Sequence, residues 1–340
     1  MSRFERTAYH LLPAIAYGDA AGLPVETRSA EYIANTHGTI DRLLPTTENP
    51  FYKGLYEAGT WSDDTELSIA VARSLIKANG FDMRAIADEH VTMYGQALQI
   101  TKPNGQTVVR GWGRSTTTAV QRYMEGVPIE QCGARDGAGN GIIMKMAPLA
   151  LWHIALETDH DEVYRDLDSI TTFTHGLPVA RVASRVHFDM LSYLSTRRFD
   201  AREFTDFAYW SALDHQRDVE ESGTDVSQAL SYLIDCPQPT TQDILDHTDG
   251  KGFYVPQTLA MAYGAFMAHN GQFAPSVYEA VNLGGDTDST GSIVAAMTTI
   301  KGLEPRDVPR DLTKIMKLDE LQQLSQSFAR SIKTARAKID

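Results

Sequence analysis

Apolar residues recur at helical spacing along much of the chain. Within residues 66–79, Leu67, Val71 and Leu75 fall every four residues, which places them on one face of an α-helix. A comparable stripe near the C-terminus consists of Leu321, Leu324, Phe328 and Ile332. Alternation with a period of two is scarce, and residues 106–111 are the best candidate for a strand. The pattern therefore predicts a mostly helical protein with glycine- and proline-containing loops.

The chain reads as one domain. No low-complexity tract, fixed-period repeat or long linker divides the sequence. Residues 235–243 are rich in proline and threonine, but they are few enough to form a helix–helix connection. We predict a single domain over residues 1–340, with residues 305–340 as a C-terminal helical extension packed on it. A stripe at helical spacing is typical of core packing, and a partner-binding face is the alternative for the stripe in this extension.

Composition and charge limit the class of protein. The 340 residues are 42% hydrophobic and 22% charged, as in globular proteins. The sequence has no apolar run near the roughly 20 residues of a membrane span, and its N-terminus lacks a signal-peptide pattern. Two isolated cysteines, Cys132 and Cys236, do not suggest a disulfide framework or a zinc cluster. These features predict a cytoplasmic protein with no membrane partner.

The net charge is acidic. At −13, it argues against nucleic acid or an anionic membrane as the main partner. An anionic ligand would need a local reversal of this field, which metal ions or backbone amides supply.

Two acidic clusters precede predicted helices. Each combines two aspartates with a serine: Ser62, Asp63 and Asp64 in the first, and Asp286, Asp288 and Ser289 in the second. Helix capping is one interpretation, because Asp63 and Glu66 match a capping box and acidic groups suit the positive end of a helix dipole.

The doubled carboxylates favour a metal site over capping alone. A cap needs one side chain, whereas crowded carboxylates repel one another and require protonation or a cation. Carboxylate and hydroxyl oxygens suit hard ions such as magnesium, calcium or manganese. If the fold brings the two helix starts together, four carboxylates can hold a pair of divalent ions.

A third interpretation of the second cluster is a phosphatase nucleophile. Residues 286–290, DTDST, resemble the D-x-D-x-T signature of haloacid-dehalogenase-type phosphatases. That signature follows a buried strand near the start of its domain, whereas here it follows EAVNLGG and only about fifty residues remain after it. The position disfavours this interpretation.

Three further segments carry candidate functional residues. Gly137, Gly139 and Gly141 alternate in a loop that lacks the G-K-[ST] ending of a Walker loop, so a tight turn and a phosphate cradle both remain open. His175 and Glu26 lie beside glycines and prolines. Taken singly, each fits a structural role as well as a functional one.

Taken together and in order, these segments resemble the ADP-ribosylglycohydrolase family over about residues 10–300. The matching motifs are Gly18-Asp19-Ala20 through Glu26, Ser62 through Thr65, Gly139 through Lys145, Thr174-His175 with Ala180, and Gly284 through Ser289. Each motif is weak alone, but five in the family's order are specific. The chain departs from the pattern at Ser62 and Ser289, where threonine is commoner, and at Lys145, where arginine is frequent.

The resemblance implies a fold and a site. The fold is an all-α, compact orthogonal helical bundle, and the site is a dinuclear Mg²⁺ centre in which Mn²⁺ is possible. The implied metal ligands are Ser62, Asp63, Asp64, Asp286, Asp288 and Ser289. The implied catalytic residues are Glu26, Asp64 and Asp286. The implied substrate-binding residues are Gly139, Asn140, Gly141, Ile142, Met144, His175 and Gly284.

The resemblance also implies an activity. It is the metal-dependent removal of mono-ADP-ribose from a modified acceptor, with protein arginine preferred, an ADP-ribosylated protein as substrate and ADP-ribose as product. Serine, a nucleic-acid base or a small ADP-ribosyl compound are alternative acceptors, and a non-catalytic ADP-ribose-binding protein is a further alternative. Residues 94–117 are expected to face the substrate. The sequence leaves the acceptor and the oligomeric state open.

Overall fold

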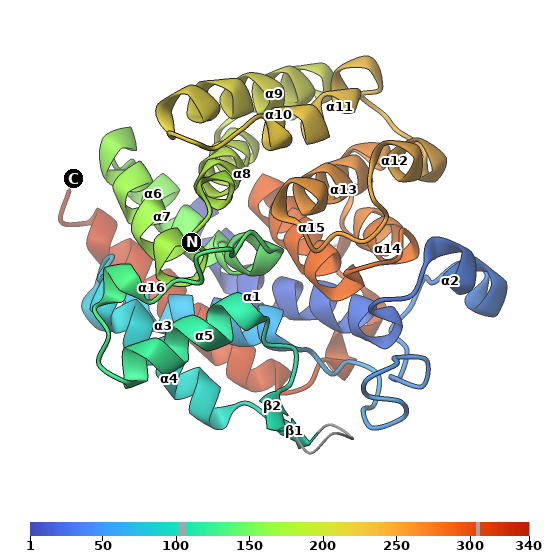
Figure 1. Cartoon of the computed structure of the whole chain (residues 1–340), viewed down its shortest axis with the longest axis horizontal. Coiled ribbons are helices and arrows are strands. Elements are labelled where there is room, and N and C mark those ends of the chain that lie inside the picture. Colours follow the sequence, from blue (N-terminus) through green and yellow to red (C-terminus); the bar gives the residue numbers. More distant parts are fainter. Residues whose placement is uncertain (102–106, 304–306, 340) are drawn as a thin grey trace.

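A computed structural model describes residues 1–101, 107–303 and 307–339 (Figure 1). Within these residues the chain forms sixteen α-helices and one pair of short strands. The first half contains α1 Arg3–Gly22, α2 Ala30–His37, α3 Asp63–Ala78, α4 Met83–Gln96, β1 Gln99–Thr101, β2 Thr107–Val109, α5 Arg114–Met124, α6 Ala147–Leu156 and α7 His160–Thr174. The second half contains α8 Pro178–Thr196, α9 Ala201–Asp218, α10 Asp225–Leu230, α11 Tyr232–Asp235, α12 Thr241–His247, α13 Val255–Ala268, α14 Phe273–Asn282, α15 Thr287–Gly302 and α16 Leu318–Arg336. The predicted all-α class is confirmed.

Local predictions agree with these elements. The stripe in residues 66–79 belongs to α3, and the proline-rich segment 235–243 connects α11 to α12. The strand expected at 106–111 contains β2, which pairs antiparallel with β1 in the register Ile100↔Val108; residue 106 lies outside the described residues. In the described part of the chain, no helix is long and apolar enough to cross a membrane.

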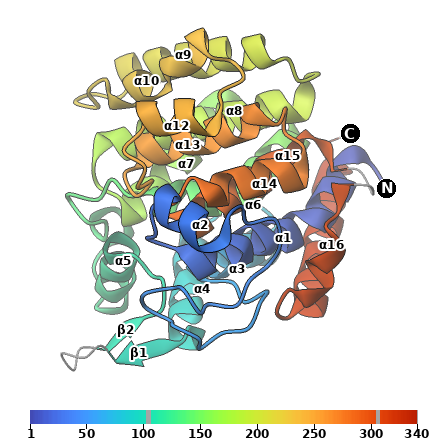
Figure 2. The same ribbon diagram turned by 90° about the vertical axis from the view of Figure 1, so that its right-hand side faces the viewer.

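Helices α1 and α15 form the centre of the molecule and contact each other more extensively than any other pair (Figures 1 and 2). Gly18 and Gly22 make this approach possible. A Cβ atom on Gly18 would lie 2.2 Å from the carbonyl oxygen of Gly291, and one on Gly22 would lie 2.2 Å from that of Thr287. Any side chain at either position would push the helices apart. The close contact therefore fixes the start of α15 against the C-terminal half of α1.

Helix α16 packs along α1, α3 and α6 (Figure 2). In its apolar stripe Leu321, Phe328 and Ile332 are buried, and the ring of Phe328 stacks on Trp152 of α6. The stripe faces the rest of the chain in this arrangement. Residues 305 and 306 of the predicted extension lie outside the described residues.

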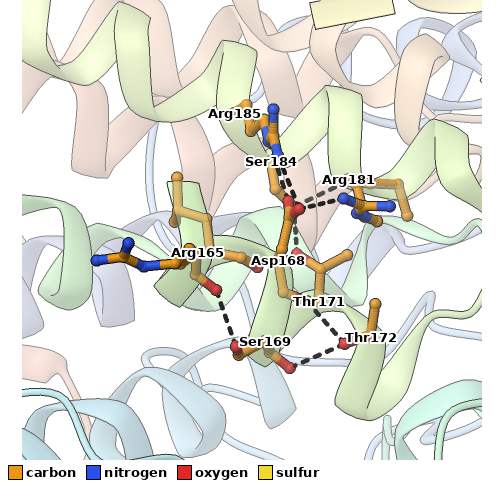
Figure 3. Close-up of polar contacts among 10 residues, drawn as sticks. Arg165, Asp168, Ser169, Thr171, Thr172, Arg181, Ser184 and Arg185 are labelled. Carbon is orange, nitrogen blue, oxygen red and sulfur yellow. Dashed lines mark hydrogen bonds and ion pairs between the residues drawn. The ribbon is translucent and has the colours of Figure 1, made fainter. Parts of the chain in front are cut away.

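An ion-pair cluster fixes the corner between α7 and α8 (Figure 3). Asp168 of α7 accepts hydrogen bonds from Arg181 and from Arg185 of α8, the latter through Nε at 3.0 Å and Nη2 at 2.7 Å. Thr171 Oγ1 and Ser184 Oγ lie 2.9 Å apart beside it. These bonds tie the two helices together next to the short connection that carries His175.

A buried histidine of α8 makes the stability depend on pH. His187 lies beneath the surface, stacks on Tyr263 and has Nδ1 3.2 Å from its hydroxyl. Burial lowers the pKa of His187 to about 3. The unfolded chain therefore takes up a proton near pH 6.5 and the folded chain does not, so this group costs stability as the pH falls through 6.5 toward 3.

We expect His187→Gln to reduce this acid sensitivity. Between pH 7 and pH 5 the wild-type protein should lose about 2 kcal/mol more unfolding free energy than the variant. Urea unfolding at both pH values measures the difference. His160→Gln, at an exposed position of α7, is the control and should keep the wild-type dependence. An unchanged pH dependence in His187→Gln would contradict the prediction.

Candidate active site

The two acidic clusters meet although more than 200 residues separate them in sequence. The hydroxyl of Ser62 lies 3.3 Å from Asp288 Oδ2, and that of Ser289 lies 3.2 Å from Asp64 Oδ2. Ser292 Oγ adds a 2.7 Å bond to Asp64 Oδ1. The starts of α3 and α15 are therefore side by side, as the hypothesis of a shared site requires.

The capping box proposed for α3 is wrong. Ser62 is the N-cap residue, and its side chain makes no capping bond within the helix. Glu66 instead accepts a 2.7 Å bond from Trp112 Nε1 and lies 3.5 Å from the guanidinium of Arg110. Asp63 and Glu66 therefore do not form a capping box, because the Glu66 carboxylate binds Trp112 and Arg110 in the segment after β2.

Asp19 of α1 caps the helix in place of Asp63. Its carboxylate accepts bonds from the backbone N–H of Ser62 at 2.8 Å and of Thr65 at 3.1 Å. It also accepts from the hydroxyls of Ser62 at 2.8 Å and Thr65 at 2.6 Å. The carboxylates of Asp63 and Asp64 are thereby left for another role. The only sequence signal was the position of Asp19 in the first motif, because its partners lie more than forty residues away.

We expect Asp19→Asn to destabilise the protein by about 2 kcal/mol. An amide has one acceptor oxygen, and its NH₂ group would face the donors of Ser62 and Thr65. Urea unfolding measures the loss. The matched control is Asp159→Asn, which changes an exposed cap of α7 and should be nearly neutral because Asn caps as well as Asp. Equal losses of unfolding free energy in the two variants would contradict the prediction, because the buried cap would then contribute no more than an exposed one.

One cavity of about 250 Å³ joins the acidic clusters to the glycine loop. Of the predicted residues, it is lined by Glu26, Asp63, Asp64, Asp286, Asp288, Ser289, Gly139, Asn140, Gly141, Met144 and His175. Ser62 lies beneath this lining, bonded to Asp19 and Asp288. Ile142 is fully buried in the hydrophobic core, and Gly284 pairs with the backbone of Ser29. Neither Ile142 nor Gly284 lines the cavity.

Further lining residues come from a segment that was predicted only as a whole, and one comes from outside every predicted segment. Gly111, Gly113, Arg114, Ser115 and Thr116 lie within the segment expected to face the substrate, of which residues 102–106 are outside the described part. Phe253, whose surface is 43% exposed, also lines the cavity, and its carbonyl accepts from the N–H of Asn140 in the glycine loop at 3.1 Å. Nothing in its local sequence distinguished Phe253 from a core residue.

The glycine loop holds one of the aspartates in place. Asn140 donates from Nδ2 to Asp286 Oδ2 at 2.7 Å and to the carbonyl of Gly252 at 2.9 Å. His175 packs against the loop, since a Cβ atom on Gly141 would lie 3.4 Å from its ring. Burial, with the nearby charge of Lys145, lowers the pKa of His175 to about 3. The imidazole is therefore neutral at physiological pH.

The electrostatics of the cavity favour a bound cation. Burial and then the charge of Asp288 raise the pKa values of Asp63, Asp64 and Asp286 well above the ordinary value, and burial raises that of Asp288. Burial and Asp288 likewise raise the pKa of Glu26. No ion pair to these four aspartates occurs within the described residues, where the buried amine of Lys145 has no hydrogen-bond partner. Among the described residues the four carboxylates thus have no ion-pair partner, and only the more distant charge of Lys145 acts on Asp63.

The side chains do not enclose an ion tightly in this arrangement. Among the residues that the structure describes, no three histidine, cysteine or acidic side chains converge as a ready metal cage. The donor set is nevertheless composed of carboxylate and hydroxyl oxygens, which are the ligands that Mg²⁺ and Mn²⁺ prefer. The chemistry of the cavity therefore fits a hard divalent ion.

The chain is similar to known proteins over most of its length. The sequence profile of the family described as ADP-ribosylglycohydrolase matches residues 2–338. The chain is 26% identical over 285 residues to an ADP-ribosyl-[dinitrogen reductase] glycohydrolase of Rhodospirillum rubrum, covering 83% of this chain and 81% of that protein. It is 23% identical over 250 residues to the ADP-ribosylarginine hydrolase Tri1 of Serratia proteamaculans, covering 71% of this chain and 60% of that protein.

The fold has a counterpart among solved structures. A chain described as an ADP-ribosylglycohydrolase-related protein complex superposes with a TM-score of 0.71 at 23% identity. The superposition covers 97% of this chain and 99% of that chain. At this identity the similarity shows a shared fold.

Proposed function

Because this chain belongs to the ADP-ribosylglycohydrolase family, we propose that it is a Mg²⁺-dependent hydrolase that removes mono-ADP-ribose from a modified acceptor. The bond cleaved is the glycosidic bond at the distal ribose. The observation that carries the proposal is the meeting of both acidic clusters, Glu26 and the glycine loop in one cavity. A structural role for the aspartates does not require four carboxyl groups without an ion-pair partner around a cavity.

The metal ions would be held by the two acidic clusters. The proposed ligands are Ser62, Asp63, Asp64, Asp286, Asp288 and Ser289, and the preferred ion is Mg²⁺, with Mn²⁺ as the alternative. Asn140 keeps Asp286 oriented. Asp19 accepts a hydrogen bond from the Ser62 hydroxyl, so that the lone pairs of the Ser62 oxygen stay free for a metal ion. When bound, such ions bind ribose hydroxyls, orient a water molecule and stabilise developing charge.

Backbone amides and one guanidinium would bind the diphosphate of ADP-ribose. A protein of net charge −13 must reverse its field locally to hold two phosphates. Gly139 and Gly141 present backbone at the cavity, and Arg114 lies at its edge. The exposed ring of Phe253 offers a flat apolar face suited to adenine.

Glu26 would transfer a proton during cleavage. Loss of the acceptor from the anomeric carbon passes through an oxocarbenium-like state, as in other glycoside hydrolysis. A carboxyl with a raised pKa at the cavity edge either protonates the departing group or takes a proton from water. His175 is neutral at working pH, because its pKa is lowered to about 3, so we assign it to substrate binding and not to proton donation as an imidazolium.

Protein arginine is the acceptor we propose first. The relative from Serratia proteamaculans is named an ADP-ribosylarginine hydrolase, and this name supports arginine over serine or a nucleic-acid base.

The test is release of free ADP-ribose from arginine- and serine-modified proteins, with Mg²⁺ and then with EDTA. Mg²⁺-dependent release from the arginine-modified protein is the expected result. Release from the serine-modified protein alone would retain the hydrolase but replace the acceptor. No release from any substrate, with ADP-ribose still bound in calorimetry, would replace the hydrolase by a binding protein.

A further inference from the structure

A single side chain forms a hydrogen bond to the carboxylate of Glu26 in the described part of the chain. It belongs to Asn49, whose Nδ2 lies 3.3 Å from Glu26 Oε2. Asn49 is completely buried, whereas Glu26 is only partly buried at the edge of the cavity. No sequence pattern indicated a role for Asn49, because it lies outside every motif.

Asn49 uses its whole side-chain amide at this position. The second proton of Nδ2 is donated to the carbonyl of Leu23 at 2.6 Å. Oδ1 accepts from the backbone N–H groups of Phe51 at 2.8 Å and Tyr52 at 3.0 Å. One side chain therefore joins the short 3₁₀ turn Leu23–Val25, directly before Glu26, to the turn that follows residue 49.

The backbone around Glu26 is anchored on its other side as well. Thr27 donates its N–H to Gly285 at 2.7 Å, and Gly285 donates back to Arg28 at 2.7 Å. Thr27 has a φ of +66°, which non-glycine residues adopt at a cost. This anchoring sets the backbone of Glu26 against the second acidic cluster. It leaves the orientation of the Glu26 side chain to Asn49.

We infer that Asn49 is the positioning residue of Glu26, directing its carboxylate toward the reacting ribose. The inference rests on the proposed function of Glu26. Asn49 touches no aspartate of the proposed metal site in any hydrogen bond described. Its removal should therefore disturb the step that Glu26 performs and leave metal binding intact.

The test substitution is Asn49→Asp. Aspartate keeps an acceptor for the N–H groups of Phe51 and Tyr52. It can donate neither to Glu26 nor to the Leu23 carbonyl, and it places a second carboxyl beside Glu26. We expect kcat to fall about 10- to 100-fold, because a small misplacement of a reacting group has effects of this size. KM and the affinity for Mg²⁺ should stay within about threefold, since only the step that Glu26 performs is disturbed.

A matched control is Asn282→Ala. Asn282 forms two 2.9 Å hydrogen bonds to the backbone of Ile40, which lies in the same connection between α2 and α3 as Asn49, and no hydrogen bond described joins Asn282 to Glu26. This variant should keep the wild-type kcat. If kcat falls as much in Asn282→Ala as in Asn49→Asp, the effect comes from a general loss of packing, and the inference is overturned.

A double-mutant cycle provides a readout that a purely structural role would not give. In a Glu26→Ala background, Asn49→Asp should change the residual kcat by less than about twofold, because the group through which Asn49 acts is gone. A full additional loss in that background would overturn the inference.

A crystal structure of Asn49→Asp separates this inference from the proposed function. Even if the wild-type protein releases no ADP-ribose, the structure should show the Glu26 carboxylate turned away from its wild-type position. A carboxylate that stays in place would overturn the positioning role, whereas absence of hydrolysis by the wild type would count against the proposed function alone.

Discussion

Replacing Asp286 by asparagine is expected to lower turnover by at least about 1,000-fold, since several kcal/mol of charge stabilisation go with a lost metal ligand. Asp286 is buried at the start of α15 and lines the cavity. Its Oδ2 accepts from Asn140 at 2.7 Å, and this bond survives in the amide if the oxygen keeps its place. The variant therefore removes charge with little change in packing.

Metal binding should show the same loss without any assay of turnover. Mg²⁺ is expected to raise the melting temperature of the wild-type protein, because a ligand that binds only the folded state stabilises it. The rise should be much smaller in Asp286→Asn. The metal-free variant should melt no lower than the metal-free wild type, because one of several repelling carboxylates has been neutralised.

The control is Asp214→Asn, which alters an exposed aspartate paired with Arg217 on α9. It should match the wild type in turnover and in the Mg²⁺-induced shift. Wild-type turnover of Asp286→Asn at limiting Mg²⁺ would refute the metal assignment. A metal-free variant that melts far below the wild type would instead indicate a packing role for Asp286.

Glu26→Gln is expected to lower kcat by about 100- to 10,000-fold, the usual contribution of a positioned acid or base. Glutamine keeps the size of the side chain and can still accept from Asn49, but it cannot transfer a proton. Mg²⁺ affinity should stay near the wild-type value because Glu26 is outside the proposed ligand set. Steady-state kinetics with Mg²⁺ titration distinguishes the two effects.

The pH profile assigns the direction of proton transfer. If Glu26 acts as the acid, the alkaline limb of the kcat profile disappears in the variant, and if it acts as the base, the acidic limb disappears. Glu57→Gln, at an exposed position between α2 and α3, is the control and should retain both limbs. A kcat of Glu26→Gln within about twofold of the wild type would remove Glu26 from the chemistry.

The sequence by itself determined the helices and the family. Leu67, Val71 and Leu75 predicted the helix that became α3, because residues three or four apart lie on one helix face whatever the rest of the chain does. Five short motifs in a fixed order identified the family, which the profile match over residues 2–338 shows. Neither inference needed to know which helices are neighbours.

Local chemistry was less informative where the partner is distant. The spacing of Asp63 and Glu66 predicted a capping box, yet Asp19 caps α3 and Glu66 binds Trp112. A capping pattern states what a carboxylate can reach within its own turn. It does not state which carboxylate the packed structure brings to the helix start.

Tertiary structure alone decided the composition of the site. The glycines of α1 let α15 approach closely enough to set its first turn beside the start of α3, so the two acidic clusters meet across more than 200 residues. Contacts between other distant segments bury Ile142 in the core and join Asn49 to Glu26. Helical periodicity depends on near neighbours in sequence, whereas contacts between distant segments depend on how whole helices fit together. For this reason the sequence predicted the acidic clusters and the glycine loop, and only the packed fold decided which side chains touch.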